Sequence, residues 1–166
     1  MNRLFTTVRT SAVAACLATL SLVAVTAHPA AAAEPAAPEL LARVVELTNL
    51  ERQQAGLAPL APNPNLAQAA QGYADVLAFG DCFAHTCGPV PDFAQRLGDA
   101  GYAGWTALGE NIAAGQPSPE DVVAAWMASP GHRANILNPA YTEIGVGAAV
   151  GGPYGRNWTQ EFGARA

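Results

Sequence analysis

The hydrophobic period of this chain changes once, and this change limits the possible folds more than any other feature. From Pro38 to about residue 129, apolar side chains recur mainly at helical spacing, whereas residues 143–150 (EIGVGAAV) and 156–162 (RNWTQEF) are typical of strands. The turn-forming stretch GGPYG separates these two strands and predicts a β-hairpin. Helices followed by strands favour an α+β layered domain over a parallel βαβ fold.

Four helices are expected, because each has a start or a stop signal. Asn63 or Asn65 can cap the second helix, and Ser118 followed by Pro119 opens the fourth. The expected helices run from Pro38 to about Gly56, from the Asn63–Asn65 region to about Gly80, over residues 91–101, and from Pro119 to Pro130–Gly131.

The positions of the tryptophans indicate which of them belong to the core. Trp126 lies on the apolar stripe of the fourth helix and Trp158 in an alternating, half-buried strand, so both are expected inside. Trp105 precedes the sequence LGEN in an expected loop and receives no role. Arg52 is expected away from the apolar stripe of the first helix.

The N-terminal residues have the pattern of a secretory signal peptide. Arg3 and Arg9 precede an apolar stretch over residues 11–27, and residues 31–33 offer an Ala-x-Ala cleavage sequence. We therefore predict a signal peptide over 1–33 with cleavage after Ala33, a linker over 34–38, one domain over 39–166, and secretion of the product. A retained membrane anchor is the alternative, because the apolar run approaches the length needed to span.

The charge of the expected mature chain excludes several classes of partner. Of the eight basic residues, all arginine, Arg3 and Arg9 fall in the signal peptide, while all thirteen acids follow it, which leaves a net charge of −7. This balance disfavours binding to nucleic acid or to anionic lipid. No stable membrane insertion is expected after cleavage, and a small lipid, glycan or peptide ligand remains open, as does the oligomeric state.

The stretch GDCFAHTCG places Cys82 and Cys87 on either side of His85. Export removes Cys16, and an isolated cysteine pair in an oxidising compartment predicts a disulfide. A zinc site would need further ligands nearby, and a redox pair is more often spaced C-x-x-C. We expect a disulfide between Cys82 and Cys87 that restricts the loop around His85.

Three polar residues are candidates for one site. His85 and His132 lie in stretches that resemble loops, and Glu110 lies among apolar and glycine residues. If they converge, the two imidazoles and the carboxylate could hold Zn²⁺ or another divalent cation. The alternative is structural, with both histidines bonding loops in place and Glu110 capping a turn.

Six stretches of the chain follow one another in a recognisable order: NLERQQAGLAPL, FAHT, GENIAAG, AWMASPGHRANILNP, TEIGVGAA and WTQEFG. Together they resemble the CAP superfamily, which contains the cysteine-rich secretory proteins, antigen 5 and the plant pathogenesis-related 1 proteins. The resemblance covers nearly all of residues 40–163.

The resemblance implies an SCP-like α-β-α sandwich with a central antiparallel sheet and a cleft that gathers histidines and acids. His85 matches the first histidine of the family, Glu110 the glutamate of its GEN motif, and His132 its second histidine. Ser129 stands where another family glutamate commonly falls, which weakens any inference that needs all four side chains. Glu143 is a further carboxylate that we do not assign to the cleft.

Three functions are compatible with these residues. The first is a secreted binding module whose cleft, with His85, Glu110, Ser129 and His132, takes a lipid, glycan or peptide, with or without a divalent metal. The second is a metal-dependent hydrolase, with Glu110 as general base or third ligand. The third is an extracellular scaffold of the cell envelope. We favour the first; no catalytic residue is assigned, because no hydrolase motif supports catalysis independently.

Overall fold

The structure is a computed structural model, and it describes residues 37–166. The predicted signal peptide over 1–33 and its cleavage point lie outside the described residues. The first helix begins at Ala37, so the last two residues of the expected linker are helical. In the described part of the chain, none of the helices combines the length and apolarity that crossing a membrane requires.

The described elements follow the predicted order of helices first and a hairpin last. All four expected helices and both expected strands are present. In chain order, the elements are α1 (Ala37–Gln54), β1 (Ala61–Pro62), α2 (Pro64–Phe79), α3 (Phe93–Asp99), β2 (Trp105–Ala114), α4 (Pro119–Ala128), α5 (Pro130–Ile136), β3 (Glu143–Val150) and β4 (Arg156–Arg165).

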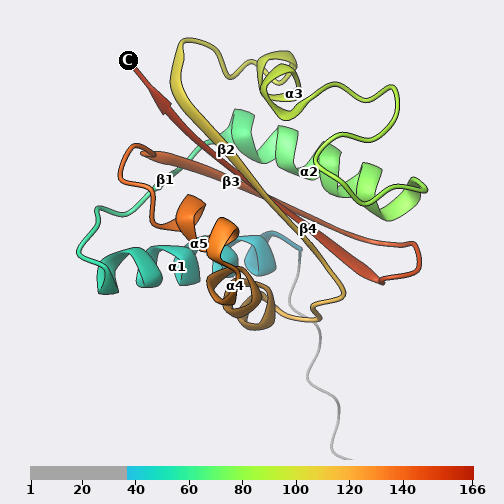
Figure 1. The fold of residues 1–166 in the computed structure, drawn as a ribbon, viewed down its shortest axis with the longest axis horizontal. Coiled ribbons are helices and arrows are strands. Elements are labelled where there is room, and N and C mark those ends of the chain that lie inside the picture. The colour runs from blue at the N-terminus through green and yellow to red at the C-terminus, as the bar shows by residue number, and fades with distance from the viewer. Residues whose placement is uncertain (1–36) are drawn as a thin grey trace, which may run out of the picture. The chain divides into compact units, whose positions relative to one another are not determined.

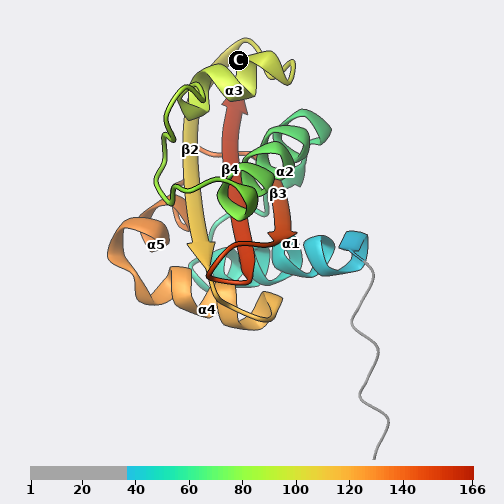
Figure 2. The same ribbon diagram turned by 90° about the vertical axis from the view of Figure 1, so that its right-hand side faces the viewer.

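The strands form one four-stranded sheet in the order β1-β3-β4-β2. The three long strands are antiparallel and lie side by side in Figure 2. The short strand β1 pairs in parallel with the start of β3, which makes the sheet mixed. The predicted α+β fold is confirmed, and its three long strands are antiparallel as expected, although β1 makes the whole sheet mixed. Strand β2 lies at the outer edge.

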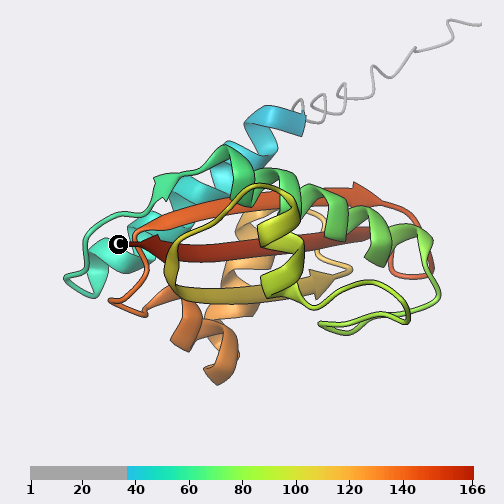
Figure 3. The same cartoon turned by 90° about the horizontal axis from the view of Figure 1, so that it is seen from above.

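Helices cover both faces of the sheet (Figure 1). Helices α2 and α3 lie over one face, and Figure 3, seen from that side, shows them in front of the strands. Helices α1, α4 and α5 cover the other face and share its main core with the sheet. Trp126 and Trp158 are both buried in that core, as predicted.

Sequence analysis missed three elements, namely the two-residue strand β1, strand β2 and helix α5. Residues 105–114 form strand β2, whereas Trp105 was expected in a loop and the GEN stretch was left unassigned. The sequence of this strand does not alternate between apolar and polar residues, because the adjacent polar residues Glu110 and Asn111 are both buried. Helix α4 ends just before Pro130, as predicted, but Pro130 also opens α5, because proline suits the first turn of a helix.

Two predicted exposures were also wrong. Strand β4 was expected to be half-buried, but residues 157–164 are buried on both faces, because helices cover both sides of the sheet and β4 lies between β2 and β3. Arg52 was expected outside the core, yet it is buried. Its guanidinium donates to the carbonyl oxygens of Ala58, Ile136, Asn138 and Tyr141, which supply the partners that a buried cation requires.

Candidate functional site

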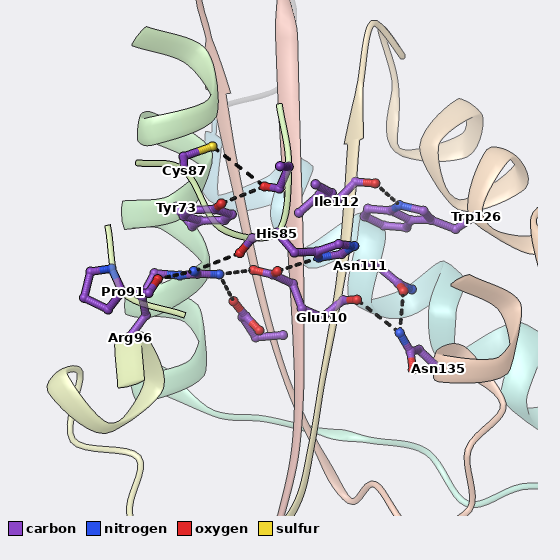
Figure 4. A network of polar contacts seen from close by, with 12 residues as sticks. Tyr73, His85, Cys87, Pro91, Arg96, Glu110, Asn111, Ile112, Trp126 and Asn135 are labelled. Carbon is purple, nitrogen blue, oxygen red and sulfur yellow. Dashed lines mark hydrogen bonds and ion pairs between the residues drawn. The ribbon is translucent and has the colours of Figure 1, made fainter. Parts of the chain in front are cut away.

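His85 and Glu110 meet beside the sheet, as drawn in Figure 4. The Nδ1 atom of His85 lies 2.7 Å from Oε1 of Glu110. The Glu110 side chain is 1% exposed and the His85 side chain 56%, so the pair joins the interior to the surface. An ionised carboxylate can only accept, so this contact places a hydrogen on Nδ1 and turns Nε2 away from Glu110.

The loop that carries His85 is held at several points. The predicted disulfide between Cys82 and Cys87 is confirmed. Cys87 is buried against Tyr73, Leu77 and Ile112, and the Tyr73 hydroxyl donates to the carbonyl oxygen of Ala84 over 2.6 Å. The backbone that presents His85 is therefore anchored to helix α2 on one side and closed by a covalent bond on the other.

Arg96 of helix α3 joins this loop to Glu110, a role that sequence analysis missed. Its guanidinium donates to the carbonyl oxygens of His85 and Pro91 over 3.2 and 2.8 Å, and it also contacts Oε2 of Glu110. The guanidinium lies over the Tyr73 ring, 3.4 Å from its centre. One arginine thus neutralises Glu110 and fixes both ends of the segment from His85 to Pro91.

Glu161 is the second residue that sequence analysis missed. It lies opposite Glu110 in the pairing of β2 with β4, and it is completely buried. Burial and the neighbouring Glu110 raise the pKa of Glu161 well above its ordinary value, and Arg96 opposes that shift. In the sequence, Glu161 alternates with the apolar residue Phe162, which predicts that the two side chains lie on opposite faces of β4. This pattern did not indicate that α2 and α3 cover the face that carries Glu161.

His132 approaches the same outer strand from the opposite face of the sheet. It lies in α5 rather than in the predicted loop. Asn111 donates to its carbonyl oxygen over 3.1 Å, and Asn135 donates to Oδ1 of Asn111 and to the carbonyl oxygen of Glu110. Burial, and secondarily the charge of nearby His85, lower the pKa of His132, which favours its neutral form.

A groove of about 400 Å³ adjoins the edge of β2 where the two histidine-bearing segments approach each other. Its described lining carries no Asp, Glu, Lys or Arg side chain. Aromatic and uncharged polar side chains share the lining, among them Phe83, Gln116, Trp126, Ser129, His132 and Tyr154.

The predicted site residues therefore fall into two neighbouring groups. His85 and Glu110 are in direct contact, whereas His132 and Ser129 line the groove. Glu143, which was not assigned to the cleft, bonds Asn63, Tyr102 and Arg165. The ligand-binding roles of these four residues stay predictions.

The predicted metal ligands do not form a three-residue cluster. Between residues 37 and 166, no group of three or more His, Cys, Asp or Glu side chains is arranged to hold a metal ion. Glu110 already contacts His85 and Arg96 with its two oxygens, so its geometry fits the orientation of His85 rather than metal ligation. A cation bound by the imidazoles alone stays a prediction.

The family model of the cysteine-rich secretory proteins matches residues 45–162. The chain belongs to this family, the CAP family. The matched residues run from within α1 to near the end of β4, so the match covers nearly the whole described fold.

Similar proteins come from several bacteria. YkwD of Bacillus subtilis is 44% identical over 123 residues, which cover 72% of this chain and 45% of YkwD. The SCP domain of an extracellular protein from Bacillus anthracis is 29% identical with a TM-score of 0.69, covering 78% of this chain and 41% of the other. An outer surface protein of Borrelia burgdorferi has a TM-score of 0.71 at 22% identity, covering 80% and 97%, and supports the fold alone. This CAP protein thus spans less than half of YkwD and of the Bacillus anthracis chain.

Proposed function

We propose that this CAP protein is an extracellular, non-enzymatic binding module whose groove takes an uncharged glycan. An extracellular location is supported by the predicted signal peptide over 1–33 and by the similar extracellular protein of Bacillus anthracis. The groove lies beside His85 and Glu110, which position the loop that contributes Phe83 to its wall.

The lining of the groove carries the proposal. Phe83 and Tyr154 expose 42% and 57% of their surfaces, and their ring centres lie 5.8 Å apart at the rim. Ser129, His132 and Gln116 add uncharged hydrogen-bonding groups. A sugar ring offers apolar faces to aromatic side chains and hydroxyl groups to polar ones, and this combination suits a pocket with few directed polar groups.

The other ligand classes fit this lining less well. An acyl chain would leave the polar groups without partners, which costs free energy when they are desolvated. A charged peptide would find no opposite charge in the lining. A hydrolase would need a general base, and the carboxylate assigned to that role is held by Arg96 and His85.

Titration of the ¹⁵N-labelled mature protein with N-acetylglucosamine oligosaccharides tests the proposal. Shifts should concentrate at Phe83, Ser129, His132 and Tyr154, and the His132→Ala and Tyr154→Ala variants should bind at least about tenfold more weakly. The matched control is Phe79→Ala, which removes an aromatic side chain that is 74% exposed outside the groove lining.

Other results would point to the alternatives. Saturable zinc binding that is lost in both His85→Ala and His132→Ala would support a metal site. Ester or peptide turnover that stops on chelation would favour the hydrolase. Oligosaccharide binding that is absent, or equal in all variants, would contradict the proposed groove and favour a scaffold that acts through other surfaces.

A further inference from the structure

A second groove adjoins the first at the pair formed by Phe83 and Tyr154. Both residues line the groove of about 400 Å³ described above and also a neighbouring groove of about 230 Å³. Their ring centres lie 5.8 Å apart, and the ring planes are inclined by 60°. The two rings therefore form part of the boundary between the grooves, and a ligand held in one groove can continue past them into the other.

Three segments that are far apart in the sequence form the second groove. The end of α2 contributes Leu77, the cysteine loop contributes Asp81 and Cys82, and the hairpin between β3 and β4 contributes Pro153 and Tyr154. Figures 1 and 3 both show the end of α2 and this hairpin at the same end of the sheet. Leu77 is buried, so the groove combines an apolar surface with one acidic side chain.

The two movable walls of this groove are held by bonds within the protein. The disulfide joins Cys82 to the buried Cys87. In the hairpin, the amide of Gly151 donates to the carbonyl oxygen of Gly155 over 2.7 Å, and the Asn157 side chain donates to both carbonyl oxygens. Walls that are ordered before binding lose little conformational entropy when a ligand arrives.

The sizes of the two grooves suit different parts of one ligand. Pockets that bind a small molecule by themselves usually have a volume of about 300 Å³ or more. The first groove exceeds this value and the second does not reach it. The second groove therefore fits an extension of a ligand that the first groove already holds.

Asp81 gives the second groove a chemistry that the first groove lacks. Among the described lining residues, Asp81 alone has a charged side chain, and it is exposed. Within residues 37–166, no group donates a hydrogen bond to its carboxylate or forms an ion pair with it. A carboxylate accepts strong hydrogen bonds from neutral donors such as sugar hydroxyl groups, whereas an acidic sugar would bring a like charge beside it.

We propose that the second groove is a second sugar subsite, in which Asp81 accepts hydrogen bonds from the hydroxyl groups of the ring next to the one in the first groove. The ligand is then a neutral oligosaccharide of at least two joined rings, and Asp81 is the specificity-determining residue that excludes acidic sugars. This inference rests on the proposed binding function and adds to it the length and the charge of the glycan.

Titration of the ¹⁵N-labelled mature protein with N-acetylglucosamine and with its disaccharide N,N′-diacetylchitobiose tests the second subsite. The monosaccharide should shift the amides of Ser129 and His132, and the disaccharide should also shift those of Gly80 and Asp81 and bind about tenfold more tightly.

The pattern of shifts separates failure of this inference from failure of the proposed function. A disaccharide that shifts Ser129 and His132 but neither Gly80 nor Asp81 would overturn the second subsite and leave the proposed function intact. Absence of shifts at all four amides would contradict the proposed function itself. Shifts at Gly80 and Asp81 alone would overturn the extension from the first groove.

A disaccharide of glucuronic acid and N-acetylglucosamine tests the role of Asp81. The wild type should bind it about fivefold more weakly than the neutral disaccharide, as expected for a like charge near an exposed carboxylate. Asp81→Asn should bring the two affinities within about twofold of each other. In the wild type, the difference should shrink as the salt concentration rises, because salt screens exposed charges.

Asp75→Asn is the matched control for Asp81→Asn. Asp75 is exposed on α2 and lies outside the linings of both grooves, and its replacement changes the net charge of the protein by the same amount. This variant should keep the fivefold difference between the two disaccharides. Equal effects of the two substitutions, or an unchanged difference in Asp81→Asn, would overturn the assignment of Asp81.

Discussion

Glu110 and Asn111 are neighbours in β2, and their side chains leave opposite faces of the sheet and secure the segments that carry the two histidines. Glu110 contacts the imidazole of His85, and Asn111 donates to the backbone carbonyl of His132. Since β2 is an outer strand, both segments can reach past its free edge. The Gly-Glu-Asn motif therefore joins the two layers at the groove.

Replacement of Arg96 should destabilise the protein strongly. Its side chain is 8% exposed, and Arg96→Met would leave the buried Glu110 without its cation. Removing one member of a buried ion pair costs about 3 kcal/mol or more, because the other charge stays desolvated. Urea denaturation should show this loss as a lower midpoint.

Arg43→Met is the matched control for Arg96→Met. Arg43 pairs with Glu46 and Glu120 on the surface, where all these side chains are well exposed. Exposed ion pairs contribute little to stability, so the denaturation midpoint should hardly move. Equal effects of the two substitutions would refute the assignment of Arg96 as the central residue of this cluster.

The disulfide should act mainly on the His85 loop. A loop closed over a separation of five residues gives a small entropic stabilisation, about 2 kcal/mol. The double variant Cys82→Ala, Cys87→Ala should therefore stay folded, while amide exchange at Phe83, His85 and Thr86 becomes faster. Exchange that accelerates throughout the domain would instead assign the bond a global role.

Acid should weaken the protein through Glu143. Hydrogen bonds from Arg165, Tyr102 and Asn63 lower the pKa of this carboxyl from 4.5 to about 2. A lowered folded-state pKa gives stability that is present above the unfolded value and is lost as the pH falls through the folded one. Its contribution is at most about 3 kcal/mol, since partial exposure screens the charges.

The Glu143→Gln variant isolates this contribution. Its stability should be lower than that of the wild type at neutral pH, and the difference should shrink between about pH 5 and pH 2. Thermal unfolding at a series of pH values measures it. A difference that stays constant with pH would show that the hydrogen bonds, rather than the charge, explain the effect.

The helices and the hairpin could be predicted because their signals are local. Asn63 accepts from the amides of Asn65 and Leu66, and Ser118 accepts from that of Asp121, as their positions before helical segments indicate. The burial of Arg52 and Glu161 could not be read in this way. The burial of Arg52 depends on carbonyl groups of a segment that is distant in the sequence, and that of Glu161 depends on the paired strand β2.

The candidate site was predicted only in part, because some of its contacts join residues that are far apart in the sequence. His85 and Glu110 were candidates because of their residue types, the family resemblance assigned them to one cleft, and the structure brings them into contact. Arg96 was read only as part of a short helix, because nothing in its neighbourhood along the chain shows that its side chain reaches across to β2. Long-range pairing of charges leaves no local period in a sequence.

The packing of α2 on the sheet gives a last prediction, on Gly147. A Cβ atom added there would overlap the backbone of Ala70 and Gln71, which cannot move without displacing the helix. Gly147→Ala should therefore cost about 3 kcal/mol, in the range found for overpacked cores.

Gly72→Ala is the matched control. Gly72 lies in the exposed face of α2, and no atom lies within 4 Å of the added Cβ. This variant should instead be more stable by about 0.5–1 kcal/mol, because alanine favours helix. Urea denaturation of both variants measures the two shifts, and a tolerated Gly147→Ala would disprove the close contact between α2 and β3.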